Sequence, residues 1–445
     1  MIVMKFGGTS VESAEAIERV AGIVRARLGR RPVVVVSAMG KTTNKLLALA
    51  NLALAGELAS ALEALDQLRA FHVENSGGAD IASLFDQLSG LVKGLAVLGE
   101  MTPRATDAVS AFGERLSSLI VTAHFRKLGI NAAHVDARSL IVTDRRHTQA
   151  APLFAETNRR LSECVPALAE KHVPVMGGFI GSTEDGITTT LGRGGSDYTA
   201  SIVGAGIGAE EIQIWTDVDG MLTADPAILP GGHRVRVCSF AEAAELAYFG
   251  AKVLHPATVL PAIEKNIPVR ILNSRRPEVE GTRIVSDPPP SSSPIRSIAC
   301  KRNITLVNIV SSRMLMAHGF LRRIFEVFDR FQTSVDMLAT SEVSVSLTID
   351  NTRALEAIRA ELETFAEVSI EQDQAIVCLV GENIRRCPDV PGRVFAALSG
   401  IRTRMVSQGA SQLNLSLVVC AADLRPAVES LHREFFRSPD PQDFA

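Results

Sequence analysis

The chain has 445 residues, of which 46% are hydrophobic and 21% charged, and its formal net charge is -3. A chain of this length predicts about three domains, with enough buried surface to fold without disulfides or a structural metal. The near-balanced charge gives no general electrostatic attraction to nucleic acid, and one Trp and two Tyr argue against a base-stacking platform. We therefore expect no nucleic-acid partner.

Targeting and redox signals predict a cytoplasmic protein with no membrane partner. The opening MIVMKFGG lacks a basic region followed by a long apolar one, so we expect no secretory signal. The apolar stretch over residues 46–55 is too short to span a bilayer. The six cysteines form no CxxC pair, which indicates reduced, buried thiols and no protein-bound transition metal.

The N-terminal part alternates short β-rich runs with helical patterns. This alternation predicts an α/β fold, a three-layer αβα sandwich around a mostly parallel sheet. The continuous run VVVV at residues 33–36 predicts a sheet that is buried on both faces. The β-rich runs are IVMKF, VVVVSAM, VPVMGGFIG, ITTTL, EIQIWTDV and PVRIL.

A Pro/Ser-rich stretch containing PPPSSS marks the clearest domain boundary, because it cannot lie inside a helix or a sheet. We expect a first domain over 1–284 and a linker over 285–296. The remaining chain repeats itself at an offset of about 70 residues, with RIF at 323–325 answered by RVF at 393–395. Such a repeat predicts two small α+β modules of the ferredoxin-like kind.

The first candidate site is KFGGTS, which begins with Lys5 at the end of the first β-rich run. Thr9 and Glu12 form a T-x-x-E pattern, which predicts a capped helix start. Glycines let the backbone approach a ligand, and a helix N-terminus offers free N–H groups and a positive dipole end. The motif therefore predicts a phosphate site, with a Gly turn beside a surface lysine as the alternative.

Two other glycine motifs resemble nucleotide fingerprints and are rejected. GKT at residues 40–42 ends like a Walker loop, but Val35 stands where that pattern requires Gly. GAGIGA at residues 204–209 follows a predicted helix and precedes a predicted strand, which is the reverse of a dinucleotide site.

Further motifs each permit a functional and a structural interpretation. In TTTLGRGGSDYTA, Arg193 stands among glycines, which suits a guanidinium that grips a carboxylate, whereas Ser196 or Asp197 could simply cap the next helix. The remaining candidates, for which a turn, a surface salt bridge or a surface lysine is the alternative, are Thr216, Asp217, Glu114 and Lys252.

In order and spacing, KFGGTS, SAMGKTTN, FGERLS, TLGRGGSD, WTDVDG and FGAKVLHP resemble the aspartate kinases, over nearly the whole chain. The repeated modules resemble that family's two ACT domains, and SAMGKTTNKLL and AELAYFGAKVLHP resemble its monofunctional, lysine-inhibited branch. The resemblance implies an amino-acid-kinase fold followed by ACT domains over 297–374, the lysine-sensing one, and 375–445. We expect residues 297–301 to join the sheet of the second ACT domain.

The resemblance implies transfer of the ATP γ-phosphoryl group to the β-carboxylate of L-aspartate, the first step toward lysine, threonine and methionine. It implies Mg²⁺ bound mainly by ATP and water. The implied catalytic residues are Lys5, Asp197 and Lys252. The implied ATP-binding residues are Lys5, Gly7, Gly8, Thr216, Asp217, Leu222 and Lys252. The implied aspartate-binding residues are Ser37, Thr43, Glu114, Arg193 and Ser196.

Two departures from the family concern the ATP site. Many relatives have Tyr and Arg where this chain has Leu222 and Ala227. Arg234 or Arg236 is a candidate replacement for that arginine. Without a replacement, the loss of one charge-assisted contact would weaken ATP binding about ten- to a hundredfold.

The resemblance also implies feedback inhibition by L-lysine at an interface between the ACT domains of two chains, and hence a homodimer or a dimer of dimers. Asp336 is the implied partner of the ammonium groups of the ligand. Met316 and Ala317 replace a His and a Ser of some lysine-sensitive relatives. The implied effector residues are Met314, Phe320, Leu321, Ser334, Val335, Asp336, Thr340, Ser341 and Glu342.

Other functions share part of this pattern. Glutamate, uridylate and acetylglutamate kinases lack FGERLS combined with two ACT domains. A fused homoserine dehydrogenase is not expected, because only a short polar tail follows Phe436. A catalytically dead lysine sensor, motivated by Leu222 and Ala227, is disfavoured because the chain retains Lys5, Glu114, Arg193, Asp197 and Lys252.

Overall fold

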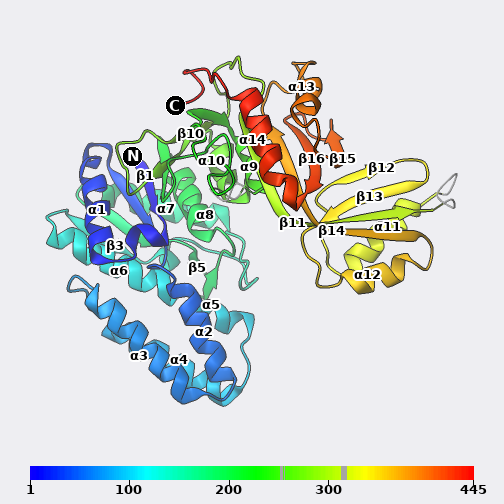
Figure 1. Ribbon diagram of the computed structural model, residues 1–445. Helices are drawn as coiled ribbons and strands as arrows, with labels where there is room; N and C mark the ends of the chain where they lie inside the picture. The colour runs from blue at the N-terminus through cyan, green and yellow to red at the C-terminus, as the bar shows by residue number, and fades with distance from the viewer. Residues whose placement is uncertain (251–253, 255, 312–317) are drawn as a thin grey trace. The chain divides into compact units, whose positions relative to one another are not determined.

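The computed structural model describes residues 1–250, 254, 256–311 and 318–445 (Figure 1). Of the predicted site residues, Lys252 and Met314 lie outside this described part, as do the departures Met316 and Ala317. Within it, no helix is both long and apolar enough to cross a membrane.

Contacts within the chain separate it into two compact units. Residues 1–221 and 253–288 form the N-terminal unit, and residues 222–252 and 289–445 form the C-terminal unit. Residues 222–252 therefore group with the C-terminal unit, whereas the sequence places them inside the domain over 1–284.

A mostly parallel sheet is the framework of the N-terminal unit. Its strands are β1 (Ile2–Phe6), β2 (Pro32–Val36), β3 (Ala132–Val135), β4 (Val173–Gly177), β7 (Glu211–Thr216), β9 (Val269–Asn273) and β10 (Thr282–Val285). They lie in the order β3-β4-β2-β1-β7-β9-β10, and β10 alone among them runs antiparallel to its neighbour β9. The run VPVMGGFIG does not form one strand, because it divides into β4 and β5 (Ile180–Ser182), which pairs with β6 (Thr188–Thr190).

Helices cover both faces of this sheet, as the apolar run at residues 33–36 predicts, and all four of those valines are fully buried. Ile2, Met4 and Phe6 of β1 belong to one core with the helices on one face, so Lys5, of opposite parity, points to the other face. The helices are α1 (Ala14–Arg25), α2 (Thr42–Leu54), α3 (Leu58–Glu74), α4 (Ala82–Leu98), α5 (Pro103–Ser110), α6 (Phe112–Lys127), α7 (Phe154–Ala169), α8 (Gly195–Ile207) and α10 (Leu260–Glu264).

The C-terminal unit contains one antiparallel sheet in the order β12-β13-β11-β14-β16-β15 (Figure 1). Its strands are β11 (Ser297–Val310), β12 (Leu338–Thr340), β13 (Ser344–Ile349), β14 (Glu367–Val380), β15 (Thr403–Gln408) and β16 (Asn414–Cys420). The short strand β8 (Val237–Ser239) belongs to the residues of this unit but not to this sheet. The helices of the unit are α9 (Phe240–Tyr248), α11 (Phe320–Arg330), α12 (Leu355–Leu362), α13 (Val390–Ala397) and α14 (Leu424–Phe435).

The two long strands β11 and β14 serve both repeats. Residues 304–310 of β11 pair with residues 367–374 of β14, and residues 297–301 pair with residues 376–380. The start of β11 thus extends the half of the sheet that contains β16 and β15.

The residues after α14 are not a free polar tail. Phe444 is buried and makes an isolated antiparallel bridge with Val235, and the Arg234 N–H donates to the Ala445 carbonyl oxygen over 2.8 Å. The Asp443 carboxylate accepts from the buried Arg296 guanidinium at 2.8 Å. The tail is therefore part of the packed C-terminal unit.

The expectation of buried thiols holds for Cys238, Cys300 and Cys378. It is wrong for Cys164, which lies on an exposed position of α7.

Candidate active site

Lys5 and Asp197 meet near the carboxyl end of the parallel sheet. Lys5 lies on β1 between β2 and β7, and its Nζ is 2.7 Å from Oδ1 of Asp197 in the first turn of α8. The two side chains are only 11% and 18% exposed. Burial strengthens the attraction between the two charges, so Asp197 holds the Lys5 ammonium group in place beside the strand ends.

The glycine loop after β1 differs from the predicted phosphate cradle. The Gly7 N–H donates to the Trp215 carbonyl oxygen over 3.1 Å, because the β1–β7 ladder continues one residue past the strand. With this bond in place the Gly7 N–H is directed at the sheet, so the structure lends no support to its predicted role at a phosphate. A Cβ at Gly8 would lie 2.7 Å from the Ala38 carbonyl oxygen and 2.9 Å from that of Gly40, so glycine is needed there for loop packing.

The helix after the glycine loop also starts later than predicted. Residues 8–11 form a 3-10 turn, and α1 begins at Ala14. The Ser13 hydroxyl caps α1 by accepting from the Ala16 N–H over 3.2 Å. The capping box predicted for Thr9 and Glu12 is therefore wrong.

Glu114 is a buried carboxylate at the start of α6. Its Oε1 accepts from the Ala38 N–H over 3.2 Å, whereas its Oε2 is buried without a hydrogen-bond partner among the described residues. Burial raises the pKa of Glu114 to about 8, and the Ala38 N–H and the Lys5 charge offset only part of that rise. A ligand ammonium group would satisfy Oε2 and restore the ionised form.

Two glycines that sequence reasoning missed bring this site together. A Cβ at Gly177 would lie 2.9 Å from Glu114 Cβ, and one at Gly178 would lie 2.7 Å from Ser196 Cα. The pair at the end of β4 therefore lets α6 and α8 approach the sheet closely. The GG in VPVMGGFIG was the available signal, since adjacent glycines at a strand end indicate a close backbone approach.

The predicted aspartate-binding residues Ser37 and Thr43 flank the same region. The Ser37 N–H donates to the Phe6 carbonyl oxygen over 3.1 Å, which fixes the loop between β2 and α2 beside Glu114. A Cβ at Gly113 would lie 3.4 Å from Thr43 Oγ1. Both side chains are half-buried, so their hydroxyls can serve a ligand as neutral hydrogen-bond partners.

Arg193 lies in the loop between β6 and α8. The loop turns through Gly192 and Gly194, whose φ angles of 78° and 72° favour glycine. The Arg193 side chain is exposed and Ser196 is half-buried. The structure thus places the long, exposed Arg193 side chain in the loop directly before α8, the helix whose first turn contains Asp197.

The predicted nucleotide residues are divided between the two units of the chain. Thr216 and Asp217 follow β7, and the Thr216 hydroxyl donates to Asp217 Oδ1 over 3.2 Å. The Thr216 carbonyl oxygen accepts from both the N–H and the hydroxyl of Ser274, at 2.8 and 3.0 Å. Leu222 belongs to the C-terminal unit, where its carbonyl oxygen accepts from the Ser297 hydroxyl over 2.6 Å.

Arg236 is committed to the C-terminal tail. Its Nε donates to the Phe444 carbonyl oxygen over 3.1 Å, and its N–H donates to the Asp443 carbonyl oxygen over 2.8 Å. This engagement argues against Arg236 as the replacement for the arginine that Ala227 lacks.

Asp336, the predicted partner of an effector ammonium group, is occupied by a lysine of the chain itself. Lys301 Nζ lies 2.6 Å from Asp336 Oδ1 and 2.8 Å from Asp350 Oδ2. The Tyr248 hydroxyl at the end of α9 lies 3.5 Å from Asp336 Oδ1. Burial disfavours the Lys301 ammonium, but its bonds to both carboxylates outweigh this and raise its pKa.

The other described effector candidates lie along α11 and the β12–β13 hairpin. Phe320 and Leu321 begin α11, and Thr340 ends β12. Ser341 and Glu342 form the exposed turn before β13, and Ser334 and Val335 precede Asp336 in the loop after α11.

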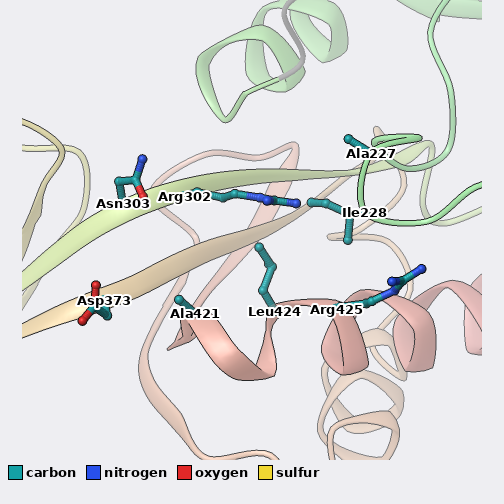
Figure 2. A pocket seen from close by; sticks show the side chains of 8 residues that line it. All are labelled: Ala227, Ile228, Arg302, Asn303, Asp373, Ala421, Leu424 and Arg425. Carbon is teal, nitrogen blue, oxygen red and sulfur yellow. The ribbon is translucent and has the colours of Figure 1, made fainter.

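A cavity of about 480 Å³ in the C-terminal unit contains none of the predicted binding residues (Figure 2). The Arg302 side chain extends along it toward Ile228, and Leu424 points into it from the start of α14 (Figure 2). Its lining residues are Ala227, Ile228, Arg302, Asn303, Asp373, Ala421, Leu424 and Arg425.

Comparison with known proteins supplies the family. Residues 1–273 match the model of the amino acid kinase family, and residues 307–365 and 377–435 match that of the ACT domain. Lysine-sensitive aspartokinase 3 of Escherichia coli (strain K12) is 36% identical over 452 residues, which cover 98% of this chain and 99% of the relative. Aspartokinase 1, chloroplastic, of Arabidopsis thaliana is 40% identical over 475 residues, covering 98% and 80%.

Solved structures agree with the sequence comparison. The crystal structure of E. coli aspartokinase III in complex with aspartate and ADP matches with a TM-score of 0.82 and 35% identity, covering 98% of this chain and all of that chain. The same enzyme in complex with lysine and aspartate matches with a TM-score of 0.82 and 34% identity, covering 98% and 99%. The predicted fold class and family are confirmed. The chain belongs to the amino acid kinase family and, within it, to the aspartokinases with C-terminal ACT domains.

Proposed function

We propose that this aspartokinase transfers the γ-phosphoryl group of ATP to the β-carboxylate of L-aspartate, giving 4-phospho-L-aspartate and ADP, the first step toward lysine, threonine and methionine. The proposal rests on the Lys5–Asp197 ion pair and on the nearby buried Glu114 carboxylate, of which only one oxygen has a hydrogen-bond partner among the described residues. The acceptor is ionised at neutral pH, so no general base is required. Catalysis is therefore the alignment of two anions and the neutralisation of charge on the transferring group.

The aspartate-binding roles follow from the chemistry of each group. Glu114 Oε2 accepts from the α-ammonium group, and Arg193 grips a carboxylate with two parallel N–H donors. Ser37, Thr43 and Ser196 supply neutral hydrogen bonds. Together these groups would distinguish an amino acid with an acidic side chain from a simple dicarboxylate.

The nucleotide-binding roles fall on the strand ends. Lys5 contacts the transferring phosphoryl group, and Asp197 holds the Lys5 ammonium in place. Gly8 rather than Gly7 offers an amide to the phosphates, because Gly7 is bonded to Trp215. The remaining proposed ATP-binding residues are Thr216, Asp217, Leu222 and Lys252.

Mg²⁺ accompanies ATP in this proposal. The described residues contain no group of three or more His, Cys, Asp and Glu that could hold a metal ion. A donor set with the single carboxylate of Asp197 beside Lys5 suits a hard ion that keeps its waters and the phosphate oxygens as ligands. When bound, the ion would neutralise charge on the phosphates.

We also propose feedback inhibition by L-lysine in the first ACT domain. The support is the buried Asp336 carboxylate, which already binds the ammonium group of Lys301, and the name of the lysine-sensitive E. coli relative. A homodimer or a dimer of dimers through the ACT domains would complete the site. Leu321 and Phe325 on α11, together with Val343 before β13, are exposed apolar side chains that self-association would cover.

The proposed domain limits keep a catalytic domain over 1–284, a linker over 285–296 and ACT domains over 297–374 and 375–445. The pairing of residues 297–301 with the far end of β14 supports their assignment to the second ACT domain. We propose a cytoplasmic location, which suits free cysteines.

Aspartate-dependent ADP formation with Mg-ATP, with the acyl phosphate trapped as its hydroxamate, tests the function. We expect activity that falls with lysine and not with threonine alone. Activity indifferent to lysine would refute the feedback proposal and keep the kinase. No activity, with lysine still raising the melting temperature, would refute the kinase and leave a lysine-binding protein.

Glu114 predicts a pH dependence of aspartate binding. With a pKa of about 8, the free carboxyl is mostly protonated at pH 6 and cannot pair with an ammonium group. We expect KM for aspartate to fall by about tenfold per pH unit as pH rises toward 8, and then to level off. Steady-state kinetics on wild type and Glu114→Gln, which lacks a titrating group, would check this; a slope retained in the variant would contradict it.

The same pKa predicts a change in stability that needs no substrate. The pKa of Glu114 is near 4.5 in the unfolded chain and about 8 in the folded protein. Between these two pH values the folded protein binds the proton more tightly than the unfolded chain does, so the free energy of unfolding falls as pH rises. The melting temperature of Glu114→Gln relative to wild type should therefore increase between pH 5 and pH 8.

A further inference from the structure

A buried carboxylate outside the proposed site joins three segments of the N-terminal unit: α5, the loop before α7 and the strand β6. Asp107 lies in α5, and its side chain is 0% exposed. Its oxygens accept from His147 Nδ1 at 2.6 Å, from the Thr148 N–H at 3.0 and 3.1 Å, and from the Thr190 hydroxyl at 2.5 Å. A charge buried this deeply persists only when such partners satisfy it.

One of these partners is backbone-strained. Thr148 has a φ of 71°, in the left-handed region that a β-branched residue rarely adopts. The Thr148 N–H donates to both carboxylate oxygens of Asp107. Strain of this kind persists only where the surroundings stabilise it, and the two hydrogen bonds from the Thr148 N–H to Asp107 are contacts that can do so.

The strained residue forms one wall of the loop that carries Arg193. A Cβ at Gly192 would lie 3.2 Å from the Thr148 carbonyl oxygen, and the Ala150 N–H donates to the Thr190 carbonyl oxygen over 3.0 Å. Phe179 forms the opposite wall with a φ of 66°, and its carbonyl oxygen accepts from the Leu191 N–H over 2.9 Å.

We propose that Asp107, together with His147, is a positioning residue that fixes the Arg193 loop for binding of the substrate carboxylate. The inference rests on the proposed function, because it takes Arg193 as an aspartate ligand. Asp107 itself touches no substrate; it acts through Thr148 and Thr190 on the strand and loop that lead to Arg193. Its first effect is therefore on aspartate and not on ATP.

Kinetics on three variants test this. Each carboxylate oxygen of Asp107 accepts two hydrogen bonds, and in Asp107→Asn an NH₂ group, which only donates, replaces one of these oxygens. We therefore expect KM for aspartate to rise roughly ten- to a hundredfold, while KM for Mg-ATP stays within about twofold. His147→Ala should show a smaller rise of the same kind. His147→Asn, which keeps a donor for Asp107, should restore KM for aspartate most of the way.

Relief of strain gives a second, independent arm. Asparagine tolerates a positive φ better than threonine. Adding Thr148→Asn to Asp107→Asn should therefore recover part of the lost aspartate affinity. The matched control is Thr157→Val. This variant removes the buried hydrogen bonds between the Thr157 hydroxyl on α7 and the backbone of Val142, a few residues before Thr148. It should lower stability without separating the two KM values.

Hydrogen exchange of residues 188–195 reads the loop without any substrate. We expect faster exchange there in His147→Ala and in Asp107→Asn. Unchanged exchange in both would overturn the positioning role even if the kinase reaction were absent. Equal rises in both KM values, or the same pattern in Thr157→Val, would mean that Asp107 is merely structural. An inactive wild type with faster exchange in the variants would refute the proposed function alone.

Discussion

Lys5→Ala is expected to lower kcat by roughly a hundredfold or more while the fold is retained. The Lys5 ammonium is the buried positive charge that the described residues place at the end of β1, 2.7 Å from Asp197. Its removal leaves the negative charge of the transferring phosphoryl group without this cation, and leaves the Asp197 carboxylate unpaired. Because β1 retains its backbone pairing with β2 and β7, the sheet should persist. ADP formation at saturating aspartate and Mg-ATP measures the loss.

Two variants separate catalysis from general damage. Lys5→Arg keeps the positive charge and should retain more activity than Lys5→Ala, although its larger head group no longer fits the same point. Lys41→Ala removes an exposed lysine of the rejected GKT motif and should leave kcat and both KM values unchanged. If Lys5→Ala kept more than about a tenth of wild-type kcat, with an unchanged melting curve, Lys5 would have no part in the transfer step.

The sheet was predictable because its strands carry their own signal. The valines at residues 33–36 form a continuous apolar run, and burial on both faces requires that pattern. The two ACT-like repeats were visible for a related reason. Alternating apolar residues such as Val345 and Leu347 in one copy, and Leu415 and Leu417 in the other, are fully buried on one face of an antiparallel sheet.

Local backbone detail was not predictable, because distant strands decide it. The T-x-x-E pattern at Thr9 and Glu12 permits a capped helix, but the chain first turns along the loop that contains Ala38 and Gly40. The Gly7 amide is used by Trp215, which is 208 residues away in sequence and adjacent only through the β1–β7 pairing. A single-sequence pattern contains neither contact.

The site was predictable in residue type but not in partners. The motifs identified Glu114, yet not its pKa of about 8, which depends on burial beneath the Ala38 loop. Asp107 gave no signal, because its partner His147 lies 40 residues away and the contact exists only once α5 packs beside β6. Long-range polar contacts of this kind become visible only with the fold.

Asp336→Asn is expected to raise the lysine concentration needed for half inhibition by roughly a hundredfold, with uninhibited kcat unchanged. The Asp336 side chain is 5% exposed, so its carboxylate is the negative charge that a ligand ammonium group would meet in a desolvated setting. The neutral amide cannot replace that interaction. Inhibition curves at fixed, near-KM substrate concentrations measure the shift, and Asp350→Asn is the matched control, because Asp350 is 45% exposed and bonds to the same Lys301.

Lys301→Met should act in the opposite direction from Asp336→Asn. In the present structure the Lys301 ammonium holds the position on Asp336 that an effector ammonium would need, so the effector must displace it. Removal of Lys301 leaves Asp336 buried without a cation, a costly state that a bound lysine would relieve. We therefore expect inhibition at a lysine concentration about tenfold lower than in wild type. Weaker inhibition in Lys301→Met would show that Lys301 supports the effector-bound form instead of competing with it, while a loss confined to Asp336→Asn would still assign the ligand ammonium to that carboxylate.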